Sequence, residues 1–96
     1  MNLTSKQRAT LRALANTLDS VLTVGKTGLT GNTAIELENL FHTRELIKGT
    51  VLETSPLTAR EAAQALAENS GASVVQVIGR RFVLYRRNTE NPVIEL

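Results

Sequence analysis

Gly25, Lys26 and Thr27 form the tripeptide that closes a Walker A loop, the bend that holds the phosphates of a nucleotide. Such a loop also needs a glycine five positions before this tripeptide, and Ser20 stands there instead. Residues 21–24 are typical of a β-strand, so no glycine-rich bend precedes the lysine. No convincing Walker B carboxylate follows a later apolar strand. The sequence therefore argues against nucleotide hydrolysis.

What remains is a Gly-x-x-Gly loop, from Gly25 to Gly28, between an expected strand and an expected helix. Two glycines allow positive φ angles and let the backbone come close to a ligand. The amides near Thr30, where the helix starts, favour a phosphate. Lys26 is the only charged side chain in residues 20–35. The loop predicts contact with the phosphates of a nucleic-acid backbone, and the alternative is a simple turn that needs glycines.

The basic residues are segregated along the chain, although the net charge is only +2. Residues 80–87 carry four arginines and no acid, and residues 1–30 carry four bases against one acid. Residues 31–79 carry three bases and six acids. Arg8 and Arg12 are four residues apart and therefore share one side of the first helix. With a pI of about 9.5, this pattern favours a face that binds a polyanion, and the alternative is an ordinary solvated surface.

Other kinds of site find little support in the composition. The chain has no cysteine, which excludes disulfides and thiolate zinc sites, and His42 is its only histidine. Phe41, Phe82 and Tyr85 are the only aromatic residues. We expect them in the core, so binding by base stacking is poorly supported and phosphate contacts should dominate. We expect no enzyme activity, no metal, no cofactor and no small-molecule substrate.

The pattern predicts three helices and four strands in the order αβαβαββ. Thr4 and Thr58 begin capping boxes, and Thr30 can cap the helix between them. Gly49 lies inside the second strand and indicates a bulge or a close contact. The expected strands are residues 21–24, 46–52, 74–78 and 81–87. The apolar stripe expected to bury the first helix is Leu11, Leu14, Ala15 and Leu18.

These elements define an α/β fold, a two-layer or sandwich arrangement with a four-stranded mixed sheet. The two strand-helix-strand units should be parallel crossovers, and the last two strands should form an antiparallel hairpin. The last strands are apolar at successive positions, which indicates that both faces of the sheet are covered. We expect residues 1–96 to form a single domain, with residues 1–87 as the folded core and residues 88–96 as a tail over the surface.

The sequence shows neither a signal-peptide pattern nor an apolar run long enough to cross a bilayer. We therefore expect no membrane partner and a cytoplasmic location. Nothing in the sequence demands more than a monomer.

The sequence resembles the YhbY-like, or CRM, family of RNA-binding domains, and most closely its free-standing bacterial members. This resemblance implies a fold like the C-terminal domain of bacterial translation initiation factor 3, with a Gly-x-x-Gly loop near the RNA-binding face. Bacterial members are associated with precursors of the large ribosomal subunit, and plant relatives act in group II intron splicing. Gly49 and Arg87 depart from the family pattern and put only local strand geometry in doubt. The resemblance is carried by residues 3–8, 11–15, 24–30, 44–48, 75–80, 83–86 and 91–92.

We therefore expect a non-catalytic RNA-binding protein that contacts structured RNA through the loop and a basic patch. The resemblance implies ribosomal RNA, or a precursor of the large subunit, as the partner. The alternative is a protein-interaction module in a ribosome-assembly or translation complex. Arg44 and Lys48 could contact RNA or pair with Glu45 or the acids of the second helix. We expect Lys26 and the arginine-bearing hairpin end to converge on one side of the molecule. The candidate RNA-binding residues are Gly25, Lys26, Thr27, Gly28, Lys6, Arg8, Arg12, Arg80, Arg81 and Arg86.

Overall fold

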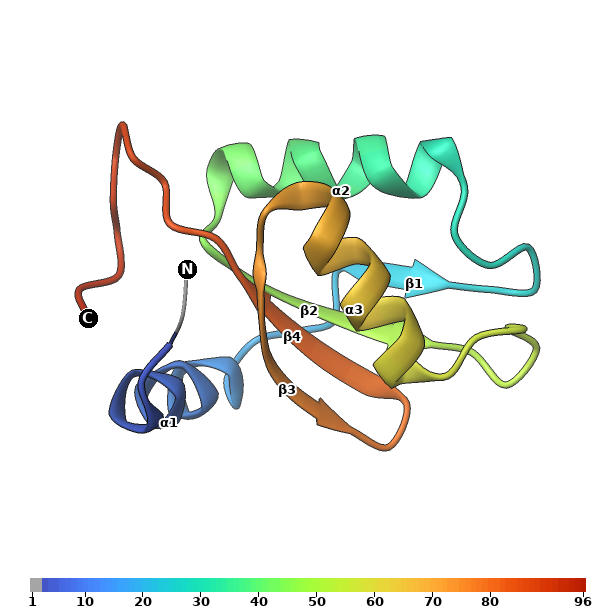
Figure 1. Cartoon of the computed structure of the whole chain (residues 1–96), viewed down its shortest axis with the longest axis horizontal. Helices are drawn as coiled ribbons and strands as arrows, with labels where there is room; N and C mark the ends of the chain where they lie inside the picture. The colour runs from blue at the N-terminus through green and yellow to red at the C-terminus, as the bar shows by residue number, and fades with distance from the viewer. Residues whose placement is uncertain (1–2) are drawn as a thin grey trace.

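A four-stranded sheet separates helices that lie on its two faces (Figure 1). The computed structural model describes residues 3–96. The elements follow the expected order αβαβαββ. The helices are α1 (Ser5–Ala15), α2 (Gly31–Thr43) and α3 (Ala59–Ser70), and the strands are β1 (Leu22–Val24), β2 (Leu46–Val51), β3 (Ser73–Ile78) and β4 (Arg81–Tyr85). None of the helices in this part of the chain is both long and apolar enough to cross a membrane.

The strand order is β1-β2-β4-β3, and the sheet is mixed as expected. β1 pairs with β2 in parallel, while β4 lies between β2 and β3 and is antiparallel to both. β2 and β3 therefore run in the same direction. Each of the two strand-helix-strand units thus joins parallel strands, and β3 and β4 form the expected hairpin.

The predicted helix caps are all present. Thr4, Thr30 and Thr58 each accept a hydrogen bond from the backbone amide three residues later. In each case the side chain at that later position bonds back to the amide of the cap residue, which completes a capping box. At α2 this partner is Thr33, whose role the sequence did not indicate. The caps satisfy amides that a helix start leaves without partners, and so they fix where each helix begins.

The larger part of the core lies between the sheet and the helices α2 and α3. Phe41 of α2 packs in the same buried cluster as Ile47, Phe82 and Leu84 of the sheet. Gly49 lies directly opposite Phe82 on the neighbouring strand. A Cβ atom at Gly49 would come within 2.3 Å of the Phe82 ring. The expected close contact at Gly49 is therefore confirmed, since a side chain there would force the Phe82 ring to move.

On the opposite face of the sheet the only helix among the described residues is α1, which gives three layers in all. Leu11 and Ala15 are buried against Leu46, Val83 and Tyr85 in a second cluster. The expectation for the other half of the α1 stripe is wrong, because Leu14 and Leu18 are 43% and 38% exposed. One short helix cannot cover four strands, so this face is covered only in part.

Residues 88–96 lie along the outer end of the sheet beside α1 (Figure 1). Ile94 packs against the second cluster. The buried carboxylate of Glu45 accepts hydrogen bonds from the backbone amides of Asn88, Val93 and Ile94, each at 2.7 Å. The tail is therefore tied to the start of β2.

Candidate nucleic-acid interface

The Lys26 loop and the Gly79–Arg80 turn lie at the same end of the sheet. The Leu52 amide donates to the carbonyl oxygen of Val24, and the Val51 amide donates to that of Arg80. These two bonds fix the loop after β1, the segment after β2 and the β3–β4 turn side by side (Figure 1). We call this the loop end of the molecule. It brings Lys26 to the same end as Arg80 and Arg81.

The loop itself is a tight turn in which the Gly28 amide donates to the carbonyl oxygen of Gly25 at 3.0 Å. Gly28 has a φ of 68°, but Gly25 does not have a positive φ, and a Cβ atom there would make only an ordinary contact. Of the two glycines, only Gly28 therefore uses the positive φ that glycine allows. Lys26 and Thr27 are exposed at the tip of the turn. The loop thus presents a cation on a backbone that Gly28 holds in shape.

The start of α2 offers fewer amides to an anion than expected. The capping box already engages the amides of Thr30 and Thr33 with side-chain oxygens. What remains is the positive end of the helix dipole over the first turn. Lys26 is therefore the one charged side chain that the loop offers to an anion.

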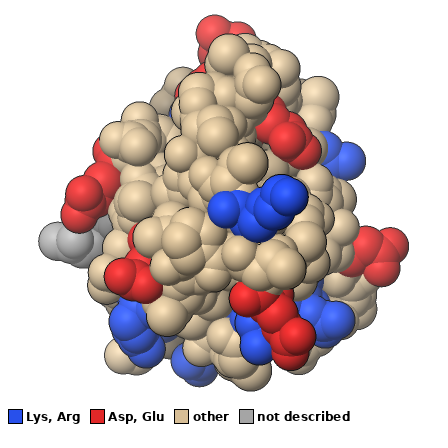
Figure 2. Space-filling view, turned by 90° about the vertical axis from the view of Figure 1, so that its right-hand side faces the viewer, with Lys and Arg blue, Asp and Glu red and all other residues tan. Residues whose placement is uncertain are grey.

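Arg80 and Arg81 are both exposed at the β3–β4 turn. Arg80 pairs with Glu53 at 3.2 Å, and both side chains face solvent. Exposed pairs of this kind contribute at most about 1 kcal/mol, so a phosphate can compete for the arginine. Figure 2 shows the loop end face-on, with one basic side chain near the middle of the face, others towards its lower edge, and carboxylates among the lower ones. The basic patch that the sequence predicts is thus interrupted by acids at this end.

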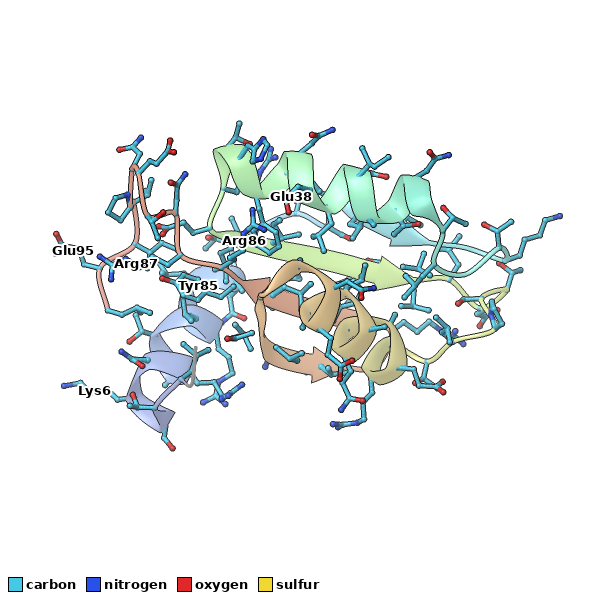
Figure 3. The ribbon with its side chains drawn as sticks, turned by 45° about the horizontal axis from the view of Figure 1, so that its top comes forward. Lys6, Glu38, Tyr85, Arg86, Arg87 and Glu95 are labelled. Carbon is cyan, nitrogen blue, oxygen red and sulfur yellow. The ribbon has the colours of Figure 1, made fainter. Side chains whose placement is uncertain are left out.

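Arg86 does not belong to the loop end, which corrects its expected place near the hairpin turn. It follows the far end of β4 and binds both carboxylate oxygens of Glu38, at 2.8 and 2.7 Å (Figure 3). It also donates to the carbonyl oxygen of Ser70, and its guanidinium lies 4.6 Å from the centre of the Phe41 ring. The hydrogen bond from Arg86 lowers the pKa of Glu38. Arg86 therefore joins α2, α3 and β4, and its charge is already paired.

The three basic residues of α1 lie in different surroundings. Arg8 donates through Nη1 to the backbone carbonyls of Val74 and Val75, so it fastens α1 to β3. Lys6 points outward at the end of the molecule that carries the tail, away from the loop end (Figure 3). Arg12 is exposed. Arg8 is therefore engaged within the fold, whereas Arg12, four residues later on the same side of α1, is exposed.

Neither Arg44 nor Lys48 forms an ion pair with Glu45 or with the acids of α2 among the described residues. The Lys48 ammonium instead lies 3.4 Å from the carbonyl oxygen of Ala15. Lys48 lines a groove beside α1 together with Asn16, Gln76 and Arg81. Sequence reasoning did not select Asn16 or Gln76, because only the strand order places them beside these cations.

Histidine and carboxylate side chains within residues 3–96 do not gather into a metal site. No cluster of three metal-ligating side chains occurs in this part of the chain. His42 is exposed and lies 3.3 Å from Glu38 on the surface of α2. Phe41, Phe82 and Tyr85 are each at most 3% exposed, so none offers a face to a base. The expected place of the aromatic residues in the core is confirmed.

Together the fold and the site define a small α/β domain that presents a Gly-x-x-Gly loop beside a basic hairpin turn. The chain matches the CRS1 / YhbY (CRM) domain over residues 3–86, and it belongs to this family. The resemblance inferred from the sequence is therefore confirmed.

Relatives match over nearly their whole length. The chain is 38% identical over 94 residues to the probable RNA-binding protein YqeI of Bacillus subtilis, covering 98% of each chain. It is 36% identical over 88 residues to an RNA-binding protein of Haemophilus influenzae, covering 92% of this chain and 89% of the relative. The structure is similar to the solution structure of the hypothetical protein SAV1595 from Staphylococcus aureus. That similarity has a TM-score of 0.82 at 39% identity and covers 99% of each chain.

Proposed function

We propose that this protein binds structured RNA through the loop end and has no catalytic activity of its own. The observation that carries the proposal is the position of Lys26, exposed on a turn that lies at the same end of the sheet as Arg80 and Arg81. Membership of the CRM family supports it, as do relatives that are named RNA-binding proteins. Gly25, Thr27 and Gly28 shape the backbone that approaches the RNA.

Binding of this kind is electrostatic and reads little sequence. Lys26, Arg80 and Arg81 can contact phosphates, whereas the buried aromatic residues cannot stack on bases. Each phosphate contact releases condensed counterions, so the affinity should fall steeply with salt concentration. The partner is then selected by the shape of its folded backbone.

The RNA we propose is ribosomal RNA, bound during assembly of the large ribosomal subunit. This finer assignment is supported by the family resemblance, since bacterial CRM proteins are associated with precursors of that subunit. It places the protein in the cytoplasm, acting as a monomer with RNA as its partner. Crosslinking in cells, followed by sequencing of the attached RNA, tests it. Reads concentrated in the large-subunit RNA are expected, and reads spread evenly over cellular transcripts would contradict the assignment.

The binding proposal is tested with Lys26→Glu and a matched control, Arg60→Glu. Both substitutions reverse one exposed charge, but Arg60 lies in the first turn of α3, outside the Gly-x-x-Gly loop. We expect Lys26→Glu to weaken binding of a labelled RNA hairpin roughly tenfold at moderate salt, because one phosphate contact becomes a repulsion. Arg60→Glu should change the affinity much less. Equal affinities for the two variants would contradict a role for the loop.

A protein-interaction module is the competing function, and the exposed Leu14 and Leu18 favour it. They line an apolar groove that Val93 of the tail also borders. Affinity capture from lysate with and without ribonuclease treatment separates the two functions. We expect the captured proteins to be lost after the nuclease, because RNA holds them. Retention of the same proteins would favour the interaction module.

A further inference from the structure

α1 leaves part of its sheet face uncovered. The strand register shows which residues lie in this uncovered part. Directly opposed residues on neighbouring strands point to the same side of a sheet. One uncovered row crosses all four strands, and the row beside it, nearer α1, crosses β2, β4 and β3. The first row is Thr23, Thr50, Arg81 and Ile78, and the second row is Lys48, Val83 and Gln76.

α1 forms a wall along the second row. Asn16, which caps the C-terminal end of α1, lines a groove with Lys48, Gln76, Ile78, Arg81 and Val83. We call this the α1 groove. Arg12 lies four residues before Asn16 and four after Arg8, so these three side chains share one side of the helix. Arg8 contacts β3 and Asn16 lines the groove, so Arg12 lies between them on the groove side.

The α1 groove has cations and amides but no carboxylate in its lining. Lys48 and Arg81 line it, and helical spacing puts Arg12 on the same side of α1 as Asn16. No ion pair among residues 3–96 involves any of the three cations. Two acids are close to groove residues in the sequence, Asp19 after Asn16 and Glu45 before Lys48. Asp19 precedes Ser20, whose hydroxyl accepts a hydrogen bond from Thr50 at the β1 side, and Glu45 binds backbone amides of the tail. The charge of the groove therefore complements a polyanion.

The dimensions and chemistry fit one strand of nucleic acid. The floor spans β2, β4 and β3, a width of about 10 Å at normal strand spacing. Asn16 and Gln76 can hydrogen-bond to phosphate or sugar oxygens. Ile78 is 63% exposed at the rim and offers an apolar surface to a ribose or a base edge. No aromatic ring is exposed in the groove, so a strand there is held without sequence readout.

We propose that the α1 groove binds a single RNA strand by its sugar–phosphate backbone, as a second contact surface beside the loop end. This inference rests on the proposed RNA-binding function and names a site for it. Arg81 connects the loop end with the α1 groove. It follows Arg80 at the hairpin turn, and it belongs to the first row of the sheet, which is the row nearer the loop end. An RNA strand that leaves the loop can therefore continue across the open sheet to α1.

The test compares two double variants that each remove two positive charges. Arg12→Gln with Arg81→Gln removes charge from the groove, and Arg44→Gln with Arg60→Gln removes it elsewhere. All four side chains are exposed, so the fold should tolerate both changes. The probe is labelled oligouridine, which is single-stranded, and the measurement is binding anisotropy over a range of salt concentrations.

We expect the groove variant to reduce the magnitude of the negative slope of log K against log salt by about 1.4, since each lost contact with a single strand removes about 0.7. The control variant should keep the wild-type slope. Adding Lys48→Gln to the groove variant should reduce the magnitude further. Lys48 also contacts the end of α1, so circular dichroism must show that the triple variant is folded. If the triple variant is unfolded, the slope of the double variant alone decides whether the α1 groove binds RNA.

Equal slopes for the groove and control variants would overturn the α1 groove as an RNA site. In that case weaker hairpin binding by Lys26→Glu would still uphold the loop end, so the two proposals fail separately. A protein that binds the wild type after nuclease treatment, and is lost from the groove variant, would also overturn the assignment to RNA.

Discussion

Gly28 lies directly against Pro56, so the Lys26 loop is supported by the segment that joins β2 to α3. A Cβ atom at Gly28 would stand 3.3 Å from Cγ of Pro56, and Gly28 has a φ of 68°. The two residues are far apart in the sequence but meet at the loop end. The shape of the loop therefore depends on a contact that the Gly-x-x-Gly motif alone does not reveal.

Gly28→Ala should destabilise the protein by about 1–2 kcal/mol, because a side chain is disfavoured at positive φ and would press on Pro56. Gly31→Ala is the matched control, since a Cβ atom there meets nothing within 4 Å and Gly31 begins α2. The control should be neutral or slightly stabilising, as alanine favours a helix. Urea denaturation measures both, and equal stabilities would show that the loop is not held as described.

Glu45→Gln should loosen the C-terminal tail. The carboxylate accepts three backbone amides, and hydrogen bonds to a charged acceptor are stronger than those to a neutral amide. We expect a loss of about 1–3 kcal/mol and faster hydrogen exchange in residues 88–96 than elsewhere. Glu53→Gln, at an exposed pair, is the control. Unchanged exchange in the tail would contradict the role assigned to Glu45.

The same carboxylate should make stability depend on pH in the acid range. Burial raises the pKa of Glu45, but the amides of Ile94, Asn88 and Val93 more than offset this, so its pKa lies below the ordinary value of 4.5. A lowered folded-state pKa contributes stability that is present above the unfolded value and lost as pH falls through the folded value. Stability should therefore decline below about pH 4.5. In thermal melts at several pH values, Glu45→Gln should show a smaller loss of stability in acid than the wild type. The same pH profile in both proteins would contradict this role of Glu45.

Arg86 should matter for stability and not for RNA binding. Its bonds to Glu38 and the Ser70 carbonyl join three elements, and its side chain is 25% exposed. We expect a double-mutant cycle of Arg86→Gln and Glu38→Gln to give a coupling of about 1 kcal/mol. The salt dependence of RNA binding should be the same as in the wild type for Arg86→Gln. A shallower salt dependence for Arg86→Gln would instead show that Arg86 contacts RNA.

Local signals made the elements and their order predictable. The caps at Thr4, Thr30 and Thr58 depend on neighbours three residues away, so the helix starts could be derived directly. The Gly49 contact was also signalled, because a glycine within an apolar strand often marks a bulge or the close approach of a neighbouring group. The family resemblance rests on short stretches of the same local kind.

The composition of the site could be predicted only in part, because it depends on pairings across the chain. The sequence groups Arg86 with the hairpin arginines, yet its partner Glu38 is 48 residues away on α2. Lys48, Gln76 and Arg81 come together only through the order β1-β2-β4-β3, which no local pattern encodes. Exposed arginines look alike in a sequence, and the fold decides which ones are paired.

The most direct test of the central claim is the salt dependence of RNA binding by the intact protein. If Lys26, Arg80 and Arg81 hold phosphates, log K for a structured RNA should fall linearly with log salt, with a slope of roughly −2 to −3. Lys26→Glu should reduce the magnitude of that slope by about 1. A flat dependence for the wild type would contradict phosphate binding at the loop end.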